Sequence, residues 1–227
     1  MTTILHIDSS ARLGRSHTRR LSARFVEAWL ARRPHDTVIR RDVGLEPPPP
    51  VTEAWIAAAF TKPERRTPEM RAALAVSDAL VDELERADLI VAGVPMYNFG
   101  LPAPMKAWVD NIVRVGRTFG FDRSRPGEPY WPMLSGKRAV LLGARGDWGY
   151  DPGGRIAGLN HAEPHLQTVF RYIGITDTVS IAVEYDEFAD ERIRHSLQAA
   201  EAEIDRLVQR MTAEEIGLPS AASIEVV

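Results

Sequence analysis

The chain has 227 residues, of which 44% are hydrophobic, and this length and composition predict one globular domain over residues 1–227. It contains no cysteine, which excludes disulfides, cysteine-bound iron–sulfur clusters and thiol catalysis and is compatible with a reducing cytoplasm, where we expect the protein. The formal charge of −3 and the absence of an apolar run of about 20 residues argue against a nucleic-acid or membrane partner.

Apolar patterns along the chain predict strands and helices in alternation. In chain order they are a strand at 3–8, a helix between Ser16 and Pro34, a strand at 37–41, a short helix near 53–60, a long helix opened by Thr67 and Pro68, a strand at 89–94, a helix at 103–115, a strand at 139–143, a helix closed by Gly174, a strand at 178–183 and a last helix opened by Asp190. Residues 43–66 and 116–137 are otherwise expected to be irregular, and the tail after residue 217 to be loose.

Five strands that alternate with helices are typical of a doubly wound α/β fold, a five-stranded parallel sheet with helices on both faces. In such a sheet a ligand lies beyond the carboxyl ends of the strands. The loops at 9–16, 95–102 and 144–154 are therefore the places where a binding site is expected.

The first of these loops has the residue types of an anion site. Hydroxyl side chains at Ser10, Ser16 and Thr18 and the arginines Arg12 and Arg15 surround the predicted helix start, whose free N–H groups favour a phosphate. A capped helix start with exposed arginines explains the same residues. No G-x-G-x-x-G and no G-x-x-x-x-G-K-[ST] follows the first strand, which disfavours a dinucleotide-binding Rossmann unit and a P-loop.

The second loop offers a platform for a flat ring. The segment from Pro95 to Pro102 contains Tyr97, Asn98 and Phe99 between two prolines. A heteroaromatic ring needs apolar surface along its faces and a few hydrogen bonds along its polar edge. A tight turn with packed aromatics is the alternative that this loop alone leaves open.

Taken together, these motifs resemble one family. Ser9-Ser10, Ser16-x-Thr18, Pro95-Met96-Tyr97-Asn98-Phe99, Lys106-x-Trp108-x-Asp110 and Gly116-x-Thr118-Phe119 are similar to the FMN-dependent NADH:quinone oxidoreductases, also called FMN-dependent NADH-azoreductases. The resemblance runs from the first predicted strand to the last predicted helix. It implies a flavodoxin-like fold, a homodimer and one non-covalently bound FMN in each subunit.

The resemblance also implies which residues bind the cofactor. The matching positions are Ser10, Ser16, His17 and Thr18 for the phosphate, Met96, Tyr97, Asn98 and Phe99 for the isoalloxazine ring, and Ala144, Arg145, Gly146 and Asp147 for a third segment. The family typically has S-R-G-G in that third segment, so a hydroxyl and one glycine are missing here. An N–H group of Arg145 or Gly146 is expected near the O2 atom of the ring.

The implied activity is two-electron transfer from NADH or NADPH to a quinone or an azo compound in a ping-pong mechanism. The flavin carries the chemistry, so no catalytic side chain and no metal is expected. Phe60 and Phe119 are the preferred candidates, among several aromatics of the irregular segments, to line the substrate pocket or the dimer interface.

Other functions receive less support from the residues. A flavodoxin-type electron carrier without substrate turnover is the main alternative, and an NAD(P)H:flavin reductase is the second. Carriers usually have a strongly acidic face and a shorter chain, whereas this chain is nearly neutral. His161 and His165 are four residues apart, but Pro164 lies between them and no third metal ligand is evident. The chain contains no G-x-S-x-G segment, which disfavours an α/β-hydrolase.

Overall fold

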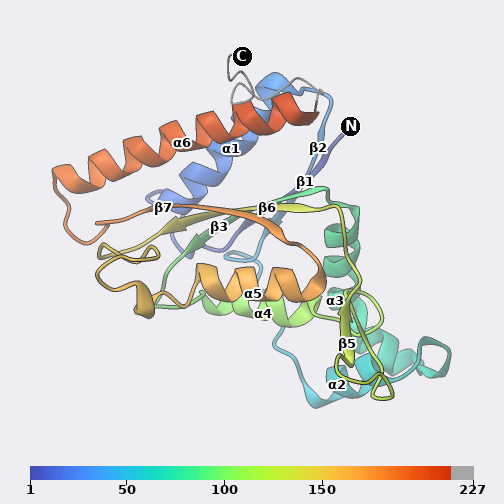
Figure 1. The fold of residues 1–227 in the computed structure, drawn as a ribbon. Helices are drawn as coiled ribbons and strands as arrows, with labels where there is room; N and C mark the ends of the chain where they lie inside the picture. The colour runs from blue at the N-terminus through green and yellow to red at the C-terminus, as the bar shows by residue number, and fades with distance from the viewer. Residues whose placement is uncertain (216–227) are drawn as a thin grey trace.

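The computed structural model describes residues 1–215, and its centre is one parallel sheet (Figure 1). Five strands pair in parallel in the order β2-β1-β3-β6-β7. Their bounds are Thr3–Asp8 for β1, Thr37–Asp42 for β2, Leu89–Pro95 for β3, Arg138–Ala144 for β6 and Asp177–Val183 for β7. The doubly wound five-stranded fold expected from the sequence is therefore confirmed.

Helices cover both faces of the sheet (Figure 1). Helices α1 and α6 lie on one face, and α3, α4 and α5 lie on the other. The bounds are His17–Arg32 for α1, Glu53–Phe60 for α2, Pro68–Arg86 for α3, Ala103–Ile112 for α4, Glu163–Ile173 for α5 and Glu191–Glu215 for α6. None of the described helices is long and apolar enough to cross a membrane.

The two layers explain why the central strands have continuous apolar sequences. All seven residues of β3 are buried, because α1 packs on one side and α3 and α4 pack on the other. Leu21, Phe25 and Trp29 recur at helical spacing on α1 and are fully buried against the sheet. The chain thus fixes α1, and with it the loop that precedes α1, rigidly on the sheet.

Local sequence signals place the helix ends correctly in most cases. Ser16 and Thr67 are N-caps whose hydroxyls accept from backbone N–H groups of the first turn, and Gly174 closes α5 with φ of 107°. Helix α4, however, ends at Ile112 rather than at residue 115. The reason is that the Arg114 N–H donates to Thr118 Oγ1 at 2.8 Å, which pulls the chain into a tight turn.

The segment 116–137 is more regular than expected. It contains an antiparallel two-stranded ribbon, β4 at Phe119–Phe121 and β5 at Tyr130–Pro132. Each strand has only three residues, which is too short for an alternating pattern to be recognised in the sequence. Aromatic contacts stabilise the ribbon: Phe119 lies 5.2 Å from Tyr172 between ring centroids, and Phe121 lies 4.8 Å from Tyr130.

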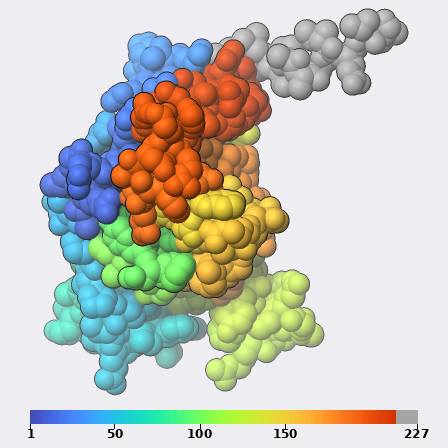
Figure 2. Space-filling model, turned by 90° about the vertical axis from the view of Figure 1, so that its left-hand side faces the viewer, coloured from blue at the N-terminus to red at the C-terminus, as the bar shows by residue number. Residues whose placement is uncertain are grey.

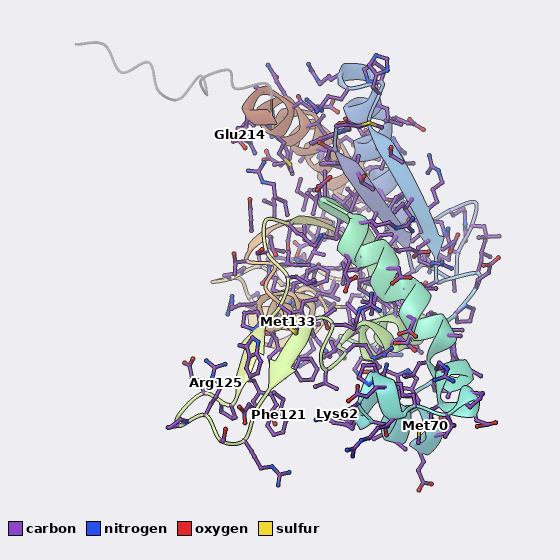
Figure 3. All side chains as sticks on the ribbon, turned by 90° about the vertical axis from the view of Figure 1, so that its right-hand side faces the viewer. Lys62, Met70, Phe121, Arg125, Met133 and Glu214 are labelled. Atoms are coloured by element: carbon purple, nitrogen blue, oxygen red, sulfur yellow. The ribbon has the colours of Figure 1, made fainter. Side chains whose placement is uncertain are left out.

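Two parts of the chain project from the helical layer formed by α3, α4 and α5. One is α2 with the chain up to the first turn of α3, marked by Lys62 and Met70 in Figure 3, and the other is the β4–β5 ribbon, marked by Phe121, Arg125 and Met133. Figure 2 shows both as separate projections at the same end of the molecule. The tail predicted to be loose after residue 217 lies outside the described residues.

Candidate functional site

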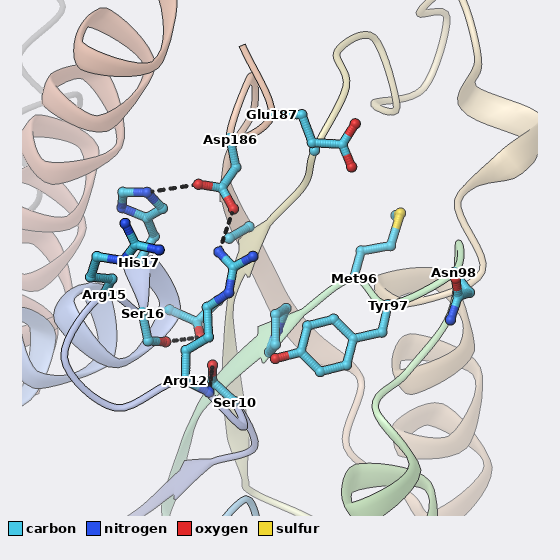
Figure 4. A pocket seen from close by; sticks show the side chains of 14 residues that line it. Ser10, Arg12, Arg15, Ser16, His17, Met96, Tyr97, Asn98, Asp186 and Glu187 are labelled. Atoms are coloured by element: carbon cyan, nitrogen blue, oxygen red, sulfur yellow. Dashed lines mark hydrogen bonds and ion pairs between the residues drawn. The ribbon is translucent and has the colours of Figure 1, made fainter. Parts of the chain in front are cut away.

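A cavity of about 280 Å³ lies at the carboxyl edge of the sheet (Figure 4). Its lining comes from the segments that follow β1, β3, β6 and β7, which meet on the face shown in Figure 2. The lining residues are Ser10, Arg12, Arg15, Ser16, His17, Thr18, Pro95, Met96, Tyr97, Asn98, Ala144, Gly146, Asp186 and Glu187. The strand order reverses between β1 and β3, and doubly wound sheets place their ligands at such a reversal.

Hydrogen bonds to β3 and from Arg19 hold the loop after β1 in place. The Ser9 hydroxyl and N–H both donate to the Gly93 carbonyl, at 2.9 and 3.1 Å. The Arg19 guanidinium donates to the carbonyls of Ser10 (2.7 Å) and Arg12 (3.0 Å). The same guanidinium pairs with Asp42 on β2, and this hydrogen bond lowers the pKa of the Asp42 carboxyl.

The start of α1 offers hydrogen-bond donors to the cavity. Ser16 caps the helix, and its hydroxyl lies 3.2 Å from that of Thr18. The N–H groups of His17 and Thr18 have no acceptor in the part of the chain that the structure describes. The first turn contains no acidic residue, so its positive helix end is not neutralised there.

Asp186 brings a negative charge to the same end of the cavity. One of its oxygens lies 3.1 Å from Nε2 of His17, and the other accepts from Arg12 at 3.1 Å (Figure 4). These contacts connect the loop after β1 to the loop after β7. Asp186 is therefore the partner of Arg12 and of the His17 ring, whereas Arg15 has no ion pair among residues 1–215.

The loop after β3 contains a strained turn. Tyr97 and Gly100 exchange two backbone hydrogen bonds, and both residues between them have positive φ, 49° at Asn98 and 68° at Phe99. Such a turn is normally made with glycine, and an aromatic residue in this conformation costs free energy. Neighbouring segments hold the turn in place, since the Tyr97 hydroxyl accepts from the Ala11 N–H at 3.2 Å and the Phe99 carbonyl accepts from the His161 N–H at 2.9 Å.

Arg145 is placed differently from the sequence expectation. Its side chain is buried and directed inward, where it pairs with Glu163 at 3.0 Å, Asp151 at 2.8 Å and Glu184 at 3.1 Å. Its N–H donates to the Val183 carbonyl at 2.8 Å and is not available to a ligand. Burial lowers the pKa of Arg145, but the surrounding carboxylates outweigh it and raise that pKa overall. Two N–H groups were expected near the O2 atom of a flavin, those of Arg145 and Gly146. Of these, only the Gly146 N–H stays available to donate to that atom.

A second cavity, of about 290 Å³, continues from the first. It shares Met96, Asn98, Gly146 and Glu187 with the first and adds Phe99, Asp147 and Tyr150. The two cavities therefore bring together every cofactor residue expected from the sequence except Arg145.

The expected pocket walls lie elsewhere. Phe60, at the end of α2, is 65% exposed, and Phe119, in the ribbon, is only 7% exposed and packs on Tyr130 and Tyr172. Neither side chain lines the two cavities. Nor do residues 1–215 contain a cluster of three side chains able to hold a metal ion.

Sequence reasoning missed Asp186 and Glu187. Their loop is joined to the loop after β6 by the Asp186 N–H, which donates to the Arg145 carbonyl, and by the Glu187 N–H, which donates to the Gly146 carbonyl, both at 3.2 Å. Acidic residues between a strand and a helix give no distinctive motif. Their position after the fifth parallel strand was the one available signal, because every such segment ends at the ligand-binding edge.

These residues fit a flavin mononucleotide by their chemistry. Hydroxyls and free N–H groups at the start of α1 suit a phosphate dianion, and Arg15 adds an unpaired positive charge. At the other end, the N–H groups of Asn98 and Phe99 have no acceptor among the described residues, and Met96 offers apolar surface. This ligand requires hydrogen-bond donors for its phosphate at one end and an apolar platform for its flat ring at the other.

Comparisons with known proteins agree with this arrangement. A family model described as flavodoxin-like fold matches residues 2–207. FMN-dependent NADH:quinone oxidoreductase 2 of Idiomarina loihiensis is 42% identical over 93% of this chain and 91% of its own length. FMN-dependent NADH:quinone oxidoreductase of Opitutus terrae is 45% identical over 94% of this chain and its full length. The crystal structure of an azoreductase from Bacillus anthracis superposes with a TM-score of 0.82 at 24% identity, covering 92% of this chain and 99% of that chain, and this likeness shows the fold.

Proposed function

This chain belongs to the flavodoxin-like fold family and, within it, to the FMN-dependent NADH:quinone oxidoreductases, and from this premise we propose that it transfers two electrons from NADH or NADPH through bound FMN to a quinone. The observation that carries the proposal is the meeting of the phosphate-type loop after β1 and the strained turn after β3 around one cavity. Reductive cleavage of an azo compound uses the same two-electron step twice and is part of the proposal.

We assign the two ends of the ligand to different parts of the chain. Ser10, Ser16 and Thr18, with the free N–H groups at the start of α1, bind the phosphate. The turn from Tyr97 to Gly100 orients the ring, whose polar edge accepts from the Asn98 and Phe99 N–H groups that have no acceptor among residues 1–215. Bound FMN supplies the hydride-accepting and electron-donating chemistry.

The protein's own contribution is positioning. The Phe99 carbonyl accepts from the His161 N–H, and the Tyr97 hydroxyl accepts from the Ala11 N–H. These bonds already fix the turn, so its backbone N–H groups need no reorganisation when charge develops on the ligand. We propose no catalytic side chain, because none is needed as a nucleophile in this reaction. Glu187 and Asp147 at the second cavity are negatively charged and lie where a substrate would approach.

Absorbance and turnover test this function directly. The purified protein, supplied with FMN, is expected to retain the flavin bands after gel filtration and to oxidise NADH in the presence of a soluble benzoquinone. Initial rates at varied NADH and quinone are expected to give the parallel double-reciprocal lines of a ping-pong mechanism. Bound FMN without quinone turnover would favour the electron-carrier alternative, and release of reduced FMN during turnover would favour the flavin-reductase alternative.

We also propose that the protein is a homodimer. The two projections described above carry exposed apolar side chains, at Ile56 and Phe60 on α2 and at Tyr130 and Met133 on and beside the ribbon. Exposed apolar surface of this kind is typical of an interface. The proposal also keeps Phe60 as a pocket wall, contributed to the cavity of the second copy, since this side chain is exposed and lines neither cavity of its own chain.

Light scattering coupled to gel filtration tests the dimer. A mass twice the 25.3 kDa of the chain is expected, and a Phe60→Asp variant is expected to shift the mass toward the monomer. A wild-type monomer at micromolar concentration would contradict the proposal. The cytoplasmic location stays a prediction, which cell fractionation tests.

A further inference from the structure

A third and larger cavity adjoins the phosphate end of the proposed FMN site. It has a volume of about 600 Å³ and lies between the loop after β1 and the first turns of α6. Its lining residues are Arg12, Gly14, Arg15, Ser16, His17, Arg20, Asp186, Ala189, Ile193, Arg194 and Leu197. The function proposed above does not use this cavity.

Positive charge is concentrated around this cavity. Four arginines line it against a single carboxylate, although the whole chain has a formal charge of −3. Arg20 pairs with Glu201 at 2.6 Å and Arg194 pairs with Glu191, but neither glutamate lines the cavity. Arg12 pairs with Asp186, so Arg15 is the one lining arginine without an ion pair among residues 1–215, and its unbalanced positive charge favours an anionic ligand.

One wall of the cavity is apolar. Ile193 and Leu197 are four residues apart on α6 and are both partly buried, so they lie on the same face of the helix. A simple inorganic anion needs no such surface. A ligand that carries both phosphate groups and a flat base matches arginines on one side and aliphatic side chains on the other.

The cavity is continuous with the phosphate cradle. Arg12, Arg15, Ser16, His17 and Asp186 line both spaces. The contacts from Asp186 to Arg12 and His17 therefore lie at the border between them (Figure 4). A ligand group in the third cavity would lie next to a phosphate bound at the start of α1.

We propose that this cavity is a second nucleotide subsite, which binds the adenosine diphosphate part of a dinucleotide. The arginines contact the phosphates, and Ile193 with Leu197 contacts the adenine. Two dinucleotides carry this group: FAD, whose flavin-side phosphate would occupy the cradle, and the NADH or NADPH donor. The inference rests on the proposed function, since it requires a flavin in the neighbouring cavity.

Charge reversal at Arg194 tests the subsite. Arg194 is exposed and does not line the FMN cavity, so the full-length Arg194→Glu variant is expected to fold and to bind FMN as the wild type does. Arg206→Glu is the matched control, because Arg206 lies on the same helix, pairs with a glutamate in the same way and does not line the cavity. Ile193→Ser is a second test of the apolar wall, with circular dichroism as the check on folding.

Three titrations are made with each variant: FMN and FAD binding by flavin fluorescence, and the KM for NADH of the FMN-loaded enzyme. If FAD is the ligand, Arg194→Glu weakens FAD binding at least tenfold and leaves FMN binding unchanged. If the donor is the ligand, the variant raises the KM for NADH at least fivefold with kcat unchanged. Ile193→Ser is expected to act as Arg194→Glu does: it weakens FAD binding if FAD is the ligand, and it raises the KM for NADH if the donor is the ligand.

The inference is overturned if Arg194→Glu and Arg206→Glu agree within twofold for both FAD and NADH. That result leaves the proposed function intact as long as FMN binds and quinone is reduced. A wild-type protein that fails to bind FMN is a different outcome, and it refutes the proposed function itself.

Discussion

Asp42 influences the candidate site although it does not line it. It lies on β2 and holds the Arg19 guanidinium, which in turn binds the carbonyls of Ser10 and Arg12. Gly44 packs closely against Ser10, since a Cβ at Gly44 would lie 2.5 Å from the Ser10 carbonyl oxygen. The conformation of the phosphate loop thus depends on residues that carry no recognisable motif.

The variant Asp42→Asn is expected to lower the free energy of unfolding by about 1–2 kcal/mol at pH 7, since a partly exposed charged pair is lost. Asp42 has a lowered pKa in the folded state, so its contribution is complete above the unfolded pKa and is lost as the pH falls through the folded value. The difference between wild type and variant should therefore be constant from about pH 5 to pH 8 and shrink below about pH 4.

Urea denaturation at a series of pH values measures this difference. Asp205→Asn is the control, because it removes a similar pair with Arg24 that is more exposed and lies away from the loop. Asp205→Asn should lower the free energy of unfolding by less than about 1 kcal/mol. If Asp42→Asn and Asp205→Asn lower the free energy of unfolding equally at pH 7, the stabilising role given to the Asp42–Arg19 pair is contradicted.

Gly93 on β3 controls how closely α1 approaches the sheet. A Cβ at this position would lie 2.8 Å from Asp8 Oδ1 and 3.0 Å from the Thr18 carbonyl oxygen. We expect Gly93→Ala to reduce the free energy of unfolding by about 1–3 kcal/mol and to weaken FMN binding, because it displaces the first turn of α1.

Gly158→Ala serves as the control for Gly93→Ala. Apart from Gly158 itself and its two chain neighbours, no described residue has an atom within 4 Å of a Cβ built there, so this variant should unfold like the wild type. Chemical denaturation and FMN titration are measured on both proteins. A Gly93→Ala protein with unchanged stability would show that α1 tolerates the displacement.

At the scale of elements, the turn after β3 illustrates strain at a binding site. Both of its central residues have positive φ, yet neither is glycine. The structure holds the turn through the two bonds between Tyr97 and Gly100 and through the contact with His161. A side chain retained in such a conformation is consistent with a role in ligand binding.

Two substitutions at Phe99 separate strain from the loss of the ring. Both Phe99→Gly and Phe99→Val remove the aromatic side chain, but only valine is β-branched and unfavourable at φ of 68°. The valine variant is expected to be less stable than the glycine variant by about 1 kcal/mol. Thermal denaturation in the absence of FMN measures this, and a valine variant as stable as the glycine variant would mean that the turn relaxes freely.

The segment after β6 is the element that departs most from the sequence expectation. Arg145 was expected at the ligand, but it lies inside the protein among Glu163, Asp151 and Glu184. The Glu184 carboxylate also accepts from the N–H groups of Gly149 and Tyr150. Arg145 therefore fixes the loop that carries Gly146 and Asp147, and its role is structural support of the cavity wall.

At the scale of the whole molecule, ligand binding and folding are coupled. A ligand that binds only the folded state stabilises it by about 2.7 kcal/mol when its concentration is 100 times Kd. For a protein of this size we expect FMN to raise Tm by about 5–10 °C. Riboflavin should raise Tm by much less, because it lacks the phosphate that the start of α1 binds.

A thermal-shift titration with both ligands measures this coupling. Equal shifts for FMN and riboflavin would argue against a phosphate site in the loop after β1. The same experiment addresses the expected single domain over residues 1–227. One cooperative transition, coincident by fluorescence and circular dichroism, would support it, and two separate transitions would contradict it.

Features that depend on near neighbours in the chain could be predicted from the amino-acid sequence. The five strands followed from short apolar runs, the helix starts at Ser16 and Thr67 from capping residues, and the two ligand-binding loops from residue types directly after β1 and β3. These signals are readable because periodicity and capping act within one element.

Which distant groups meet could be seen only in the folded chain. It brought Asp186 to Arg12 and His17, placed Arg145 inside a cluster of carboxylates and formed a basic cavity between the first loop and α6. Arg145 and Glu163 are 18 positions apart and Arg12 and Asp186 are 174 positions apart, and their pairing depends on the order of the strands in the sheet. No local pattern encodes that order, because any parallel strand with its helix could occupy several places in the sheet.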